Sequence, residues 1–261
     1  MASERHAFLT LATAAMLIFS LTPLILISIF SINESRFYAF PITGLTLQWY
    51  RDLLADERIW SSLLSSLLIA AGVSVISTCM GTAFAFVVVR SAGRYWRTIS
   101  AIGFIPLAVP VLVLAAALQV AFVELGLPLG YGTVIIGHTI FATPFVVLMV
   151  VAQLYRYDQR LDAAARDLGA SPIETFRYVT LPILMPSIRS GAILAFLLSF
   201  NEWAIAFFTG RGFNTLPMLV YSMQRNGLPP SVLAYSSLIV IFVLATVLLL
   251  LPFVLRMLRR D

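Results

Sequence analysis

The side chain in this sequence best suited to chemistry is Glu202, which stands between Asn201 and Trp203 in the apolar segment LLSFNEWAIAFF. It is the only charged residue between Arg189 and Arg211. An ionisable group inside a membrane-crossing segment is costly unless it faces protein or a water-filled cavity. A carboxylate beside an indole suits an ammonium group through charge pairing and a cation–π contact. We predict that Asn201, Glu202 and Trp203 line a solute path. The alternative is a structural carboxylate bonded to a neighbouring helix or subunit.

The sequence contains no motif for nucleotide or metal chemistry. Walker A, HExxH, GxSxG and dinucleotide-binding glycine patterns are all missing from it. Without a phosphate-binding loop the chain is not expected to hydrolyse ATP, and we expect no catalytic residue, metal site or cofactor in it. His138, in GHTIFATP, is too isolated to ligate a metal and is expected to have a hydrogen-bonded packing role. The single cysteine, Cys79, cannot form an internal disulfide.

Residues 158–182 form a polar, helix-patterned block between two long apolar runs. Asp158 can cap a first helix, and Gly169 follows that helix as a C-terminal stop. Asp162 and Arg166 have the i, i+4 spacing of an ion pair. The apolar residues of this helix recur on one face, at Leu161, Ala164, Ala165 and Leu168.

A second helix is predicted directly after the first. Ser171-Pro172-Ile173-Glu174 has the residues of a capping box with proline in the first turn, and Pro182 is expected to end the helix. The whole block is either a docking element for a soluble partner or an amphipathic loop that lies on the bilayer surface.

The elements that must position these residues are membrane helices. The sequence is 60% apolar and 11% charged, with mean hydropathy +0.96, which excludes an ordinary soluble domain. It has no lysine, and its 17 arginines stand at the ends of apolar runs, so we expect contact with membrane lipid and no nucleic-acid partner. Charge-poor runs predict six transmembrane helices, at approximately 9–31, 60–89, 99–123, 132–154, 190–209 and 233–255.

Arginine placement predicts the orientation of these helices. With the N-terminus inside, the inner segments hold 12 arginines and the outer segments hold 5. This bias places both termini and residues 158–182 in the cytosol. Pro106 and Pro110, one turn apart, predict a bent or broken third helix. The chain is therefore expected to be a single all-α transmembrane domain over residues 1–261.

The block also resembles a known family motif. Ala163-Ala164-Ala165-Arg166-Asp167-Leu168-Gly169, then nine residues, then Val179-Thr180-Leu181-Pro182, is similar to the EAA loop of ABC-importer permeases. That pattern reads E-A-A-x-x-x-G, nine residues, then I-x-L-P. Further segments resemble the spermidine/putrescine-type permeases of the PotC-like group, namely FSINESRF, TGLTLQWY, FATPFVV and LSFNEW…TLP…YSM.

The resemblance implies a type I importer permease fold, in which six helices form half of the transport path. It implies partners as well: two ATPase subunits that bind ATP and Mg²⁺, a second permease subunit of the PotB-like kind, and an extracytoplasmic solute-binding protein. It places the chain in the bacterial cytoplasmic (inner) membrane. By the same resemblance, the residues that couple to the ATPase are Asp162, Ala164, Ala165, Arg166, Asp167, Leu168, Gly169, Leu181 and Pro182.

One position departs from the motif. Ala163 stands where the family has glutamate, and the acid appears one residue earlier, as Asp162. That shift moves the carboxylate about 100° around a helix. Two outcomes stay open: Asp162 reaches an ATPase arginine after a small rotation, or the partner permease supplies this contact.

The expected function is passage of a small polar, amine-containing solute, such as a polyamine or an opine, in an ATP-driven importer. Many relatives carry aspartate where Asn201 stands, so the path of this chain has one fewer negative charge. Smaller amines with fewer positive charges therefore remain candidate solutes. Two alternatives remain. One is the permease of an ABC sugar importer, because an Asn-Glu pair occurs at a similar place in that group. The other is a stand-alone secondary carrier whose loop at 158–182 lies on lipid.

Overall fold

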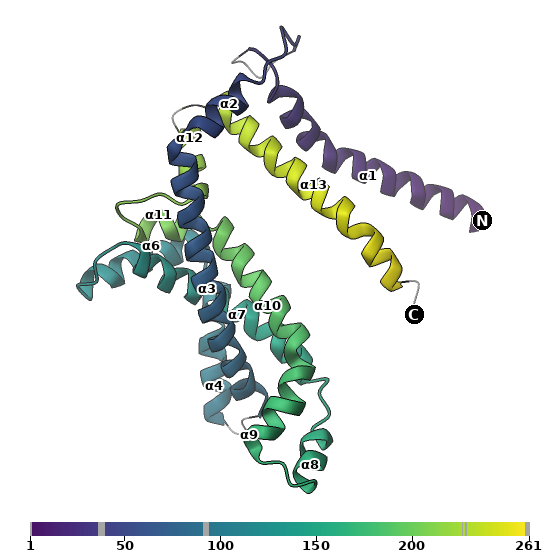
Figure 1. Ribbon diagram of the computed structural model, residues 1–261, viewed down its shortest axis with the longest axis vertical. Coiled ribbons are helices and arrows are strands. Elements are labelled where there is room, and N and C mark those ends of the chain that lie inside the picture. The colour runs from purple at the N-terminus through teal and green to yellow at the C-terminus, as the bar shows by residue number, and fades with distance from the viewer. Residues whose placement is uncertain (1, 36–39, 91–93, 226, 228, 259–261) are drawn as a thin grey trace. The chain divides into compact units, whose positions relative to one another are not determined.

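The structure is a computed structural model that describes residues 2–35, 40–90, 94–225, 227 and 229–258 (Figure 1). Arg36, Arg259 and Arg260, which count in the arginine bias, lie outside these ranges. Within them the regular elements are helices, and Asn33 and Leu45 form an isolated antiparallel bridge. The predicted all-α class is confirmed for the described part of the chain.

The helices follow one another with short connections. In chain order they are α1 (Ala2–Phe30), α2 (Gln48–Ala55), α3 (Glu57–Arg90), α4 (Arg94–Gly103), α5 (Ile105–Ala108), α6 (Val111–Glu124), α7 (Tyr131–Leu154), α8 (Arg160–Asp167), α9 (Pro172–Thr175), the π-helix η1 (Phe176–Thr180), α10 (Leu181–Asn201), α11 (Ala204–Thr209), α12 (Leu216–Arg225) and α13 (Pro230–Leu258). The chain forms two compact units. The first unit joins Met1–Ile59 to Val220–Asp261, and the second is Trp60–Leu219.

In the first unit, α13 packs against both α1 and α2. Two hydrogen bonds tie the end of α1 to α2. The indole Nε1 of Trp49 donates to the carbonyl of Asn33 (2.8 Å), and the hydroxyls of Ser31 and Tyr50 lie 2.6 Å apart. The two ends of the chain therefore meet in one unit, although more than 150 residues of sequence separate them.

In the second unit, α7 forms the centre. Val146, Val147 and Val150 on this helix are buried, and α10 packs along it. Gly81 of α3 and Gly191 of α10 both face Val146. A Cβ atom added at these glycines would lie 2.8 Å and 3.1 Å, respectively, from the nearest Val146 side-chain atom. Small residues at helix crossings allow this close approach of backbones in membrane proteins.

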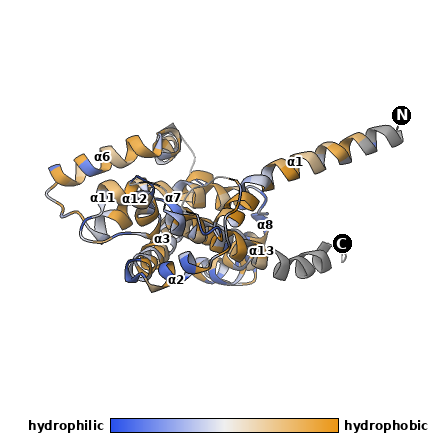
Figure 2. Ribbon diagram, turned by 90° about the horizontal axis from the view of Figure 1, so that it is seen from above, coloured by the Kyte–Doolittle hydropathy of each residue, from blue (hydrophilic) through white to orange (hydrophobic). Residues whose placement is uncertain are grey.

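Four described helical runs are long and apolar enough to cross a membrane: Phe8–Phe30, Glu57–Arg90, Tyr131–Leu154 and Pro172–Asn201. They overlap the first, second, fourth and fifth spans predicted from sequence. Shorter apolar helices, Val111–Glu124 and Pro230–Phe242, fall in the regions of the third and sixth. Figure 2 shows α1 and α6 as hydrophobic over most of their length.

The third predicted span, 99–123, is broken as expected. α4 ends at Gly103, α5 is a single turn with Pro106 in its first positions, and Pro110 is the N-cap of α6. Each proline lacks the N–H that would continue the preceding helix. The prediction of a broken third helix is confirmed, and the apolar helix that follows is short.

The fifth predicted span, 190–209, begins earlier and ends earlier in the structure. A continuous helical run covers Pro172–Asn201, so Pro182 does not end the helix as predicted. Pro182 lies in the first turn of α10, directly after the π-helical turn Phe176–Thr180. The wider π turn changes the hydrogen-bond register just before the proline, whose missing N–H and bulky ring an α-helix would not tolerate.

Candidate coupling site and solute path

The first helix of the 158–182 block ends as its sequence predicts. Gly169 has φ +91°, and its N–H donates to the carbonyl of Arg166 (2.9 Å). The N–H of Ala170 donates to the carbonyl of Ala165 (3.1 Å), which completes a Schellman motif. At the other end, the Asp158 carboxylate accepts from the N–H of Arg160 (2.9 Å). The predicted helix is confirmed.

The capping box of the second helix is also confirmed. The N–H of Glu174 donates to the Ser171 hydroxyl (3.3 Å), and the N–H of Ser171 donates to the Glu174 carboxylate (2.8 Å). Two well-capped helices therefore give the block a defined shape between α7 and α10.

The apolar side chains of this block point outward. Leu168 is 90% exposed, Ile173 is 78% exposed and Leu161 is 45% exposed. The small side chains of Ala163 and Ala164 are also exposed, next to the charged Arg166 and Asp167. Figure 1 shows α8 at the end of the second unit, past the ends of α3 and α7. Apolar side chains gathered on a protruding polar loop indicate an interaction site.

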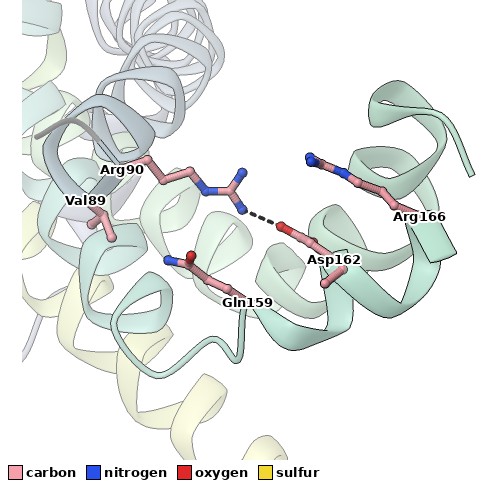
Figure 3. Close-up of a pocket in the computed structure, with 6 residues that line it drawn as sticks. Val89, Arg90, Gln159, Asp162 and Arg166 are labelled. Carbon is pink, nitrogen blue, oxygen red and sulfur yellow. Dashed lines mark hydrogen bonds and ion pairs between the residues drawn. The ribbon is translucent and has the colours of Figure 1, made fainter.

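The acidic side chain of the same helix points inward. Asp162 is 9% exposed, and three donors surround its carboxylate. The Tyr157 hydroxyl donates to Oδ1 (2.5 Å), and the Thr180 hydroxyl donates to the same oxygen (2.8 Å). The guanidinium of Arg90 donates to Oδ2 through Nη2 (2.9 Å) and forms an ion pair (Figure 3). α8 thus buries one acid, Asp162, and exposes its other charged residues together with the leucines at either end, Leu161 and Leu168.

The predicted ion pair between Asp162 and Arg166 is wrong. Asp162 pairs with Arg90 of α3, and Arg166 points into the space between α3 and α8 (Figure 3). This space is a cavity of about 410 Å³ lined by Val89, Arg90, Gln159, Asp162, Ala163 and Arg166. Ala163, where the motif has glutamate, lies at its wall. Arg90 is the favoured partner because two hydroxyl donors already orient the Asp162 carboxylate toward it. An exposed i, i+4 pair with Arg166 would lack this orientation and would be weak in water.

The protonation states of this cluster follow from its contacts. Burial raises the pKa of Asp162, but hydrogen bonds from Tyr157 and Thr180 and the charge of Arg90 outweigh it, so the pKa lies below the usual value of 3.8. Burial, together with the bond to Asp162, raises the pKa of the Tyr157 hydroxyl above 10.0. At neutral pH, therefore, the carboxylate is charged and the tyrosine keeps its proton.

The other predicted coupling residues fall in two places. Ala164, Arg166, Asp167, Leu168 and Gly169 are exposed along and just after α8, and Ala165 is half-buried. Leu181 and Pro182 lie in the first turn of α10, beyond η1, which packs against α8. The sequence reasoning missed Arg90, Tyr157 and Thr180, because no local spacing links them to Asp162. The one sequence feature that could have indicated Arg90 is its position at the end of a long uncharged run.

The three residues of the predicted solute path meet where α10 ends and α11 begins. Glu202 lies at this break, because α10 stops at Asn201 within the predicted span 190–209. Its Oε1 accepts from the N–H groups of Ala204 (2.7 Å) and Ile205 (3.2 Å), which caps α11. Trp203 packs against the buried pair Ala204 and Ile205.

The amide of Asn201 bonds the carbonyl of Leu197 (2.9 Å), one turn back along α10. The other carboxylate oxygen of Glu202 makes no hydrogen bond among the described residues, and the side chain is half-buried. Glu202 therefore has a capping role, and the solute role stays a prediction. His138 is buried, and its Nδ1 lies 2.8 Å from the Ser199 hydroxyl, as its expected packing role requires.

Comparison with known proteins places this architecture among transporters. Residues 77–261 match the family described as binding-protein-dependent transport system inner membrane component. The putrescine transport system permease PotI of Escherichia coli K12 is 36% identical over 231 residues, which cover 85% of this chain and 81% of PotI. The spermidine/putrescine transport system permease PotC of the same strain is 32% identical over 226 residues, with 86% and 85% of the two chains covered.

Solved structures share the fold. A chain of a bacterial ABC transporter involved in import of the acidic polysaccharide alginate superposes with TM-score 0.68 at 17% identity, covering 98% of both chains. A chain of the MetNI methionine ABC transporter in an inward-facing conformation superposes with TM-score 0.60 at 21% identity, covering 81% of this chain and 98% of the other.

The family match and the relatives PotI and PotC define the class of this chain as an ABC-importer permease, and the solved structures show the same fold. More particularly, this chain belongs to the family of binding-protein-dependent transport system inner membrane components. It is a permease, a transport component without an ATPase site of its own. Permeases of this family work with ATPase subunits and with a solute-binding protein.

Proposed function

We propose that this chain forms one half of the path through which an ATP-driven importer of the bacterial cytoplasmic membrane passes an amine-containing solute. In this proposal the chain crosses the membrane six times, with both termini in the cytosol. The 12-to-5 arginine bias supports the orientation. The helical run Val111–Glu124 and the full length of α13 supply the two spans beyond the four long apolar runs.

The observation that carries the proposal is that α8 bonds its acid Asp162 inside the chain while Leu168, at its end, stays exposed. A helix that lay passively on lipid would expose its charges to water and rest its leucines on the membrane. α8 instead extends past the helix ends, buries its acid Asp162 in the chain, and exposes Leu168 beside the charged Arg166 and Asp167. We assign residues 158–182 as the element that docks into a cleft of an ATPase subunit. ATP and Mg²⁺ bind elsewhere, on the ATPase subunits themselves.

A second permease subunit, of the PotB-like kind, completes the path in this proposal. The relatives PotI and PotC are named as permeases of multi-component transport systems. One face of α6 carries an open apolar groove of about 690 Å³ lined by Leu112, Val113, Ala116, Ala117, Val120 and Ala121. Such a small-residue face suits close packing against another membrane helix.

Putrescine and spermidine are the first solutes to test, because the relatives' names specify them. The half-buried carboxylate of Glu202, beside Trp203, suits a cationic amine by charge and by cation–π contact. Asn201 contributes no charge, so the break between α10 and α11 offers a single negative group to the passing solute.

The docking role is tested by co-expression with the neighbouring ATPase, permease and binding-protein genes. The wild-type chain should purify as a complex with the ATPase. Leu168→Asp should reduce ATPase recovery strongly, whereas Leu45→Asp, at a comparably exposed leucine on the opposite side of the predicted membrane, should not. A chain that transports its solute alone, as a monomer, would contradict the importer assignment.

The solute class is tested in proteoliposomes that hold the complete complex and its binding protein. ATP should drive uptake of labelled putrescine. Uncharged 1,4-butanediol, which has the same carbon chain without the amines, should not compete for uptake. Equal competition by the diol would argue against recognition of the ammonium groups and would favour an uncharged solute.

A further inference from the structure

We propose that Arg90 and Asp162 form a joint that converts movement of the docked helix α8 into movement of the membrane helices α3, α7 and α10. They act as positioning residues rather than as contacts with the ATPase. This inference rests on the proposed docking of α8 and deepens it, because it names the groups inside the chain that transmit the motion.

The first support is the origin of the three donors to one carboxylate. Arg90 is the last residue of α3, Tyr157 follows the end of α7, and Thr180 is the last residue before α10. All three bond Asp162, at 2.9 Å, 2.5 Å and 2.8 Å. A single side chain of α8 therefore fastens this helix to the inner ends of three membrane-crossing helices.

The second support is a ring contact that braces the arginine. The guanidinium of Arg90 lies over the Phe86 ring, 5.0 Å from its centroid. Phe86 in turn meets Phe176 of η1 edge to face, with centroids 5.8 Å apart. The guanidinium of Arg90 is therefore held between Asp162 of α8 and the Phe86 ring of α3, and Phe86 is in turn braced by η1.

The third support is the surface that remains for the ATPase. Asp162 is buried, and three donors from its own chain already bond its carboxylate, so little of its acceptor capacity remains for the partner. Ala163 has no charge to offer at the position of the motif glutamate. The ATPase would thus contact apolar groups such as Leu168, while the pair of Arg90 and Asp162 transmits the motion inside this chain. Coupling between two sites needs such a connected element that both sites can bias.

The joint predicts loss of coupling without loss of docking. In proteoliposomes with the complete complex, Asp162→Asn and Arg90→Gln should each lower putrescine uptake per ATP hydrolysed by roughly tenfold, a usual scale for allosteric coupling. Both variants should still co-purify with the ATPase. Arg90→Lys, which keeps the charge, should retain more uptake per ATP than Arg90→Gln.

A double-mutant cycle tests whether the pair acts as one unit. The double variant R90Q/D162N should lose no more coupling than either single variant, because both remove the same connection. Arg58→Gln breaks another arginine–aspartate pair, Arg58 with Asp56 at 2.7 Å, which is exposed and far from α8 in sequence. It should leave uptake per ATP unchanged.

Three results would overturn the joint: unchanged uptake per ATP in both single variants, additive losses in the double variant, or loss of ATPase co-purification. The last would mean that Asp162 maintains the docking surface. If Asp162→Asn does not fold, Tyr157→Phe removes one neutral donor from the same carboxylate and should give a smaller loss of the same kind. Failure of the wild-type complex to transport would sink the proposed function instead.

Discussion

Gly169 allows a sharp test of docking, because a second glycine shares its local geometry. Gly169 (φ +91°) and Gly126 (φ +68°) each end a helix in a Schellman motif, and a Cβ added at either would meet nothing within 4 Å. The N–H of Gly126 donates to the carbonyl of Val123 (2.9 Å), as that of Gly169 does to Arg166. The two sites differ in place: one follows α8 and the other follows α6.

Leucine at Gly169 or at Gly126 introduces the same conformational strain, because both positions have positive φ. An L-residue in the left-handed region is disfavoured by about 1–2 kcal/mol, and neither site adds an internal clash. That strain shifts the local helix-end equilibrium by roughly 5- to 30-fold, a tolerable loss for a folded chain. Any additional defect of Gly169→Leu must come from something that approaches the exposed end of α8 from outside.

We expect Gly169→Leu to insert normally but to lose ATPase co-purification and ATP-driven uptake. Gly126→Leu should keep both, with a similar drop in thermal stability. Gly169→Ala carries the strain with little added volume and should fall between Gly169→Leu and the wild type. Recovery of the ATPase by affinity purification in detergent measures the first effect, and uptake in proteoliposomes measures the second. Equal behaviour of the two leucine variants would refute docking at this helix end.

Three more predictions concern packing, charge and pH. Gly81→Val should destabilise the solubilised chain by about 1–3 kcal/mol through overpacking, whereas Gly72→Ala, whose nearest neighbour is 3.8 Å away, should not; thermal unfolding compares them. Glu202→Gln keeps an acceptor for the α11 cap, so it should lower putrescine uptake while leaving the melting temperature near that of the wild type, and unchanged uptake would leave Glu202 a capping residue only. Because the folded pKa of Asp162 lies below 3.8, its stabilisation is present above that pH and is lost as pH falls through the folded pKa. The melting-temperature gap between wild type and Asp162→Asn should therefore be constant between about pH 5 and pH 8 and should begin to narrow below about pH 4, as pH falls toward the folded pKa.

Much of the local structure of the 158–182 block could be predicted from sequence. The Schellman glycine Gly169 and the capping box at Ser171 and Glu174 each depend on residues within a few positions of one another. The broken third helix depends on Pro106 and Pro110 in the same way. Such features are decided by backbone donors and acceptors that the neighbouring residues satisfy or remove, so spacing alone predicts them.

What the sequence could not supply is contact between distant segments. The partner of Asp162 is Arg90, 72 residues earlier, and the i, i+4 spacing pointed instead to Arg166. The charge of Arg189 predicts that the fifth span starts after it, whereas the helix runs from Pro172 through this exposed arginine. A long arginine side chain can extend toward water while its helix continues.

The most direct measurement of the central claim is a cross-link from the exposed tip of α8. The only cysteine of the sequence is Cys79, so a Cys79→Ser background that carries Leu168→Cys offers a single thiol. In membranes that contain the complete transporter, a short thiol-reactive cross-linker should join this thiol to the ATPase subunit, and the yield should change when ATP is added. Absence of that cross-link, with labelling of the thiol by a lipid-phase reagent instead, would place α8 on the bilayer and contradict the docking role.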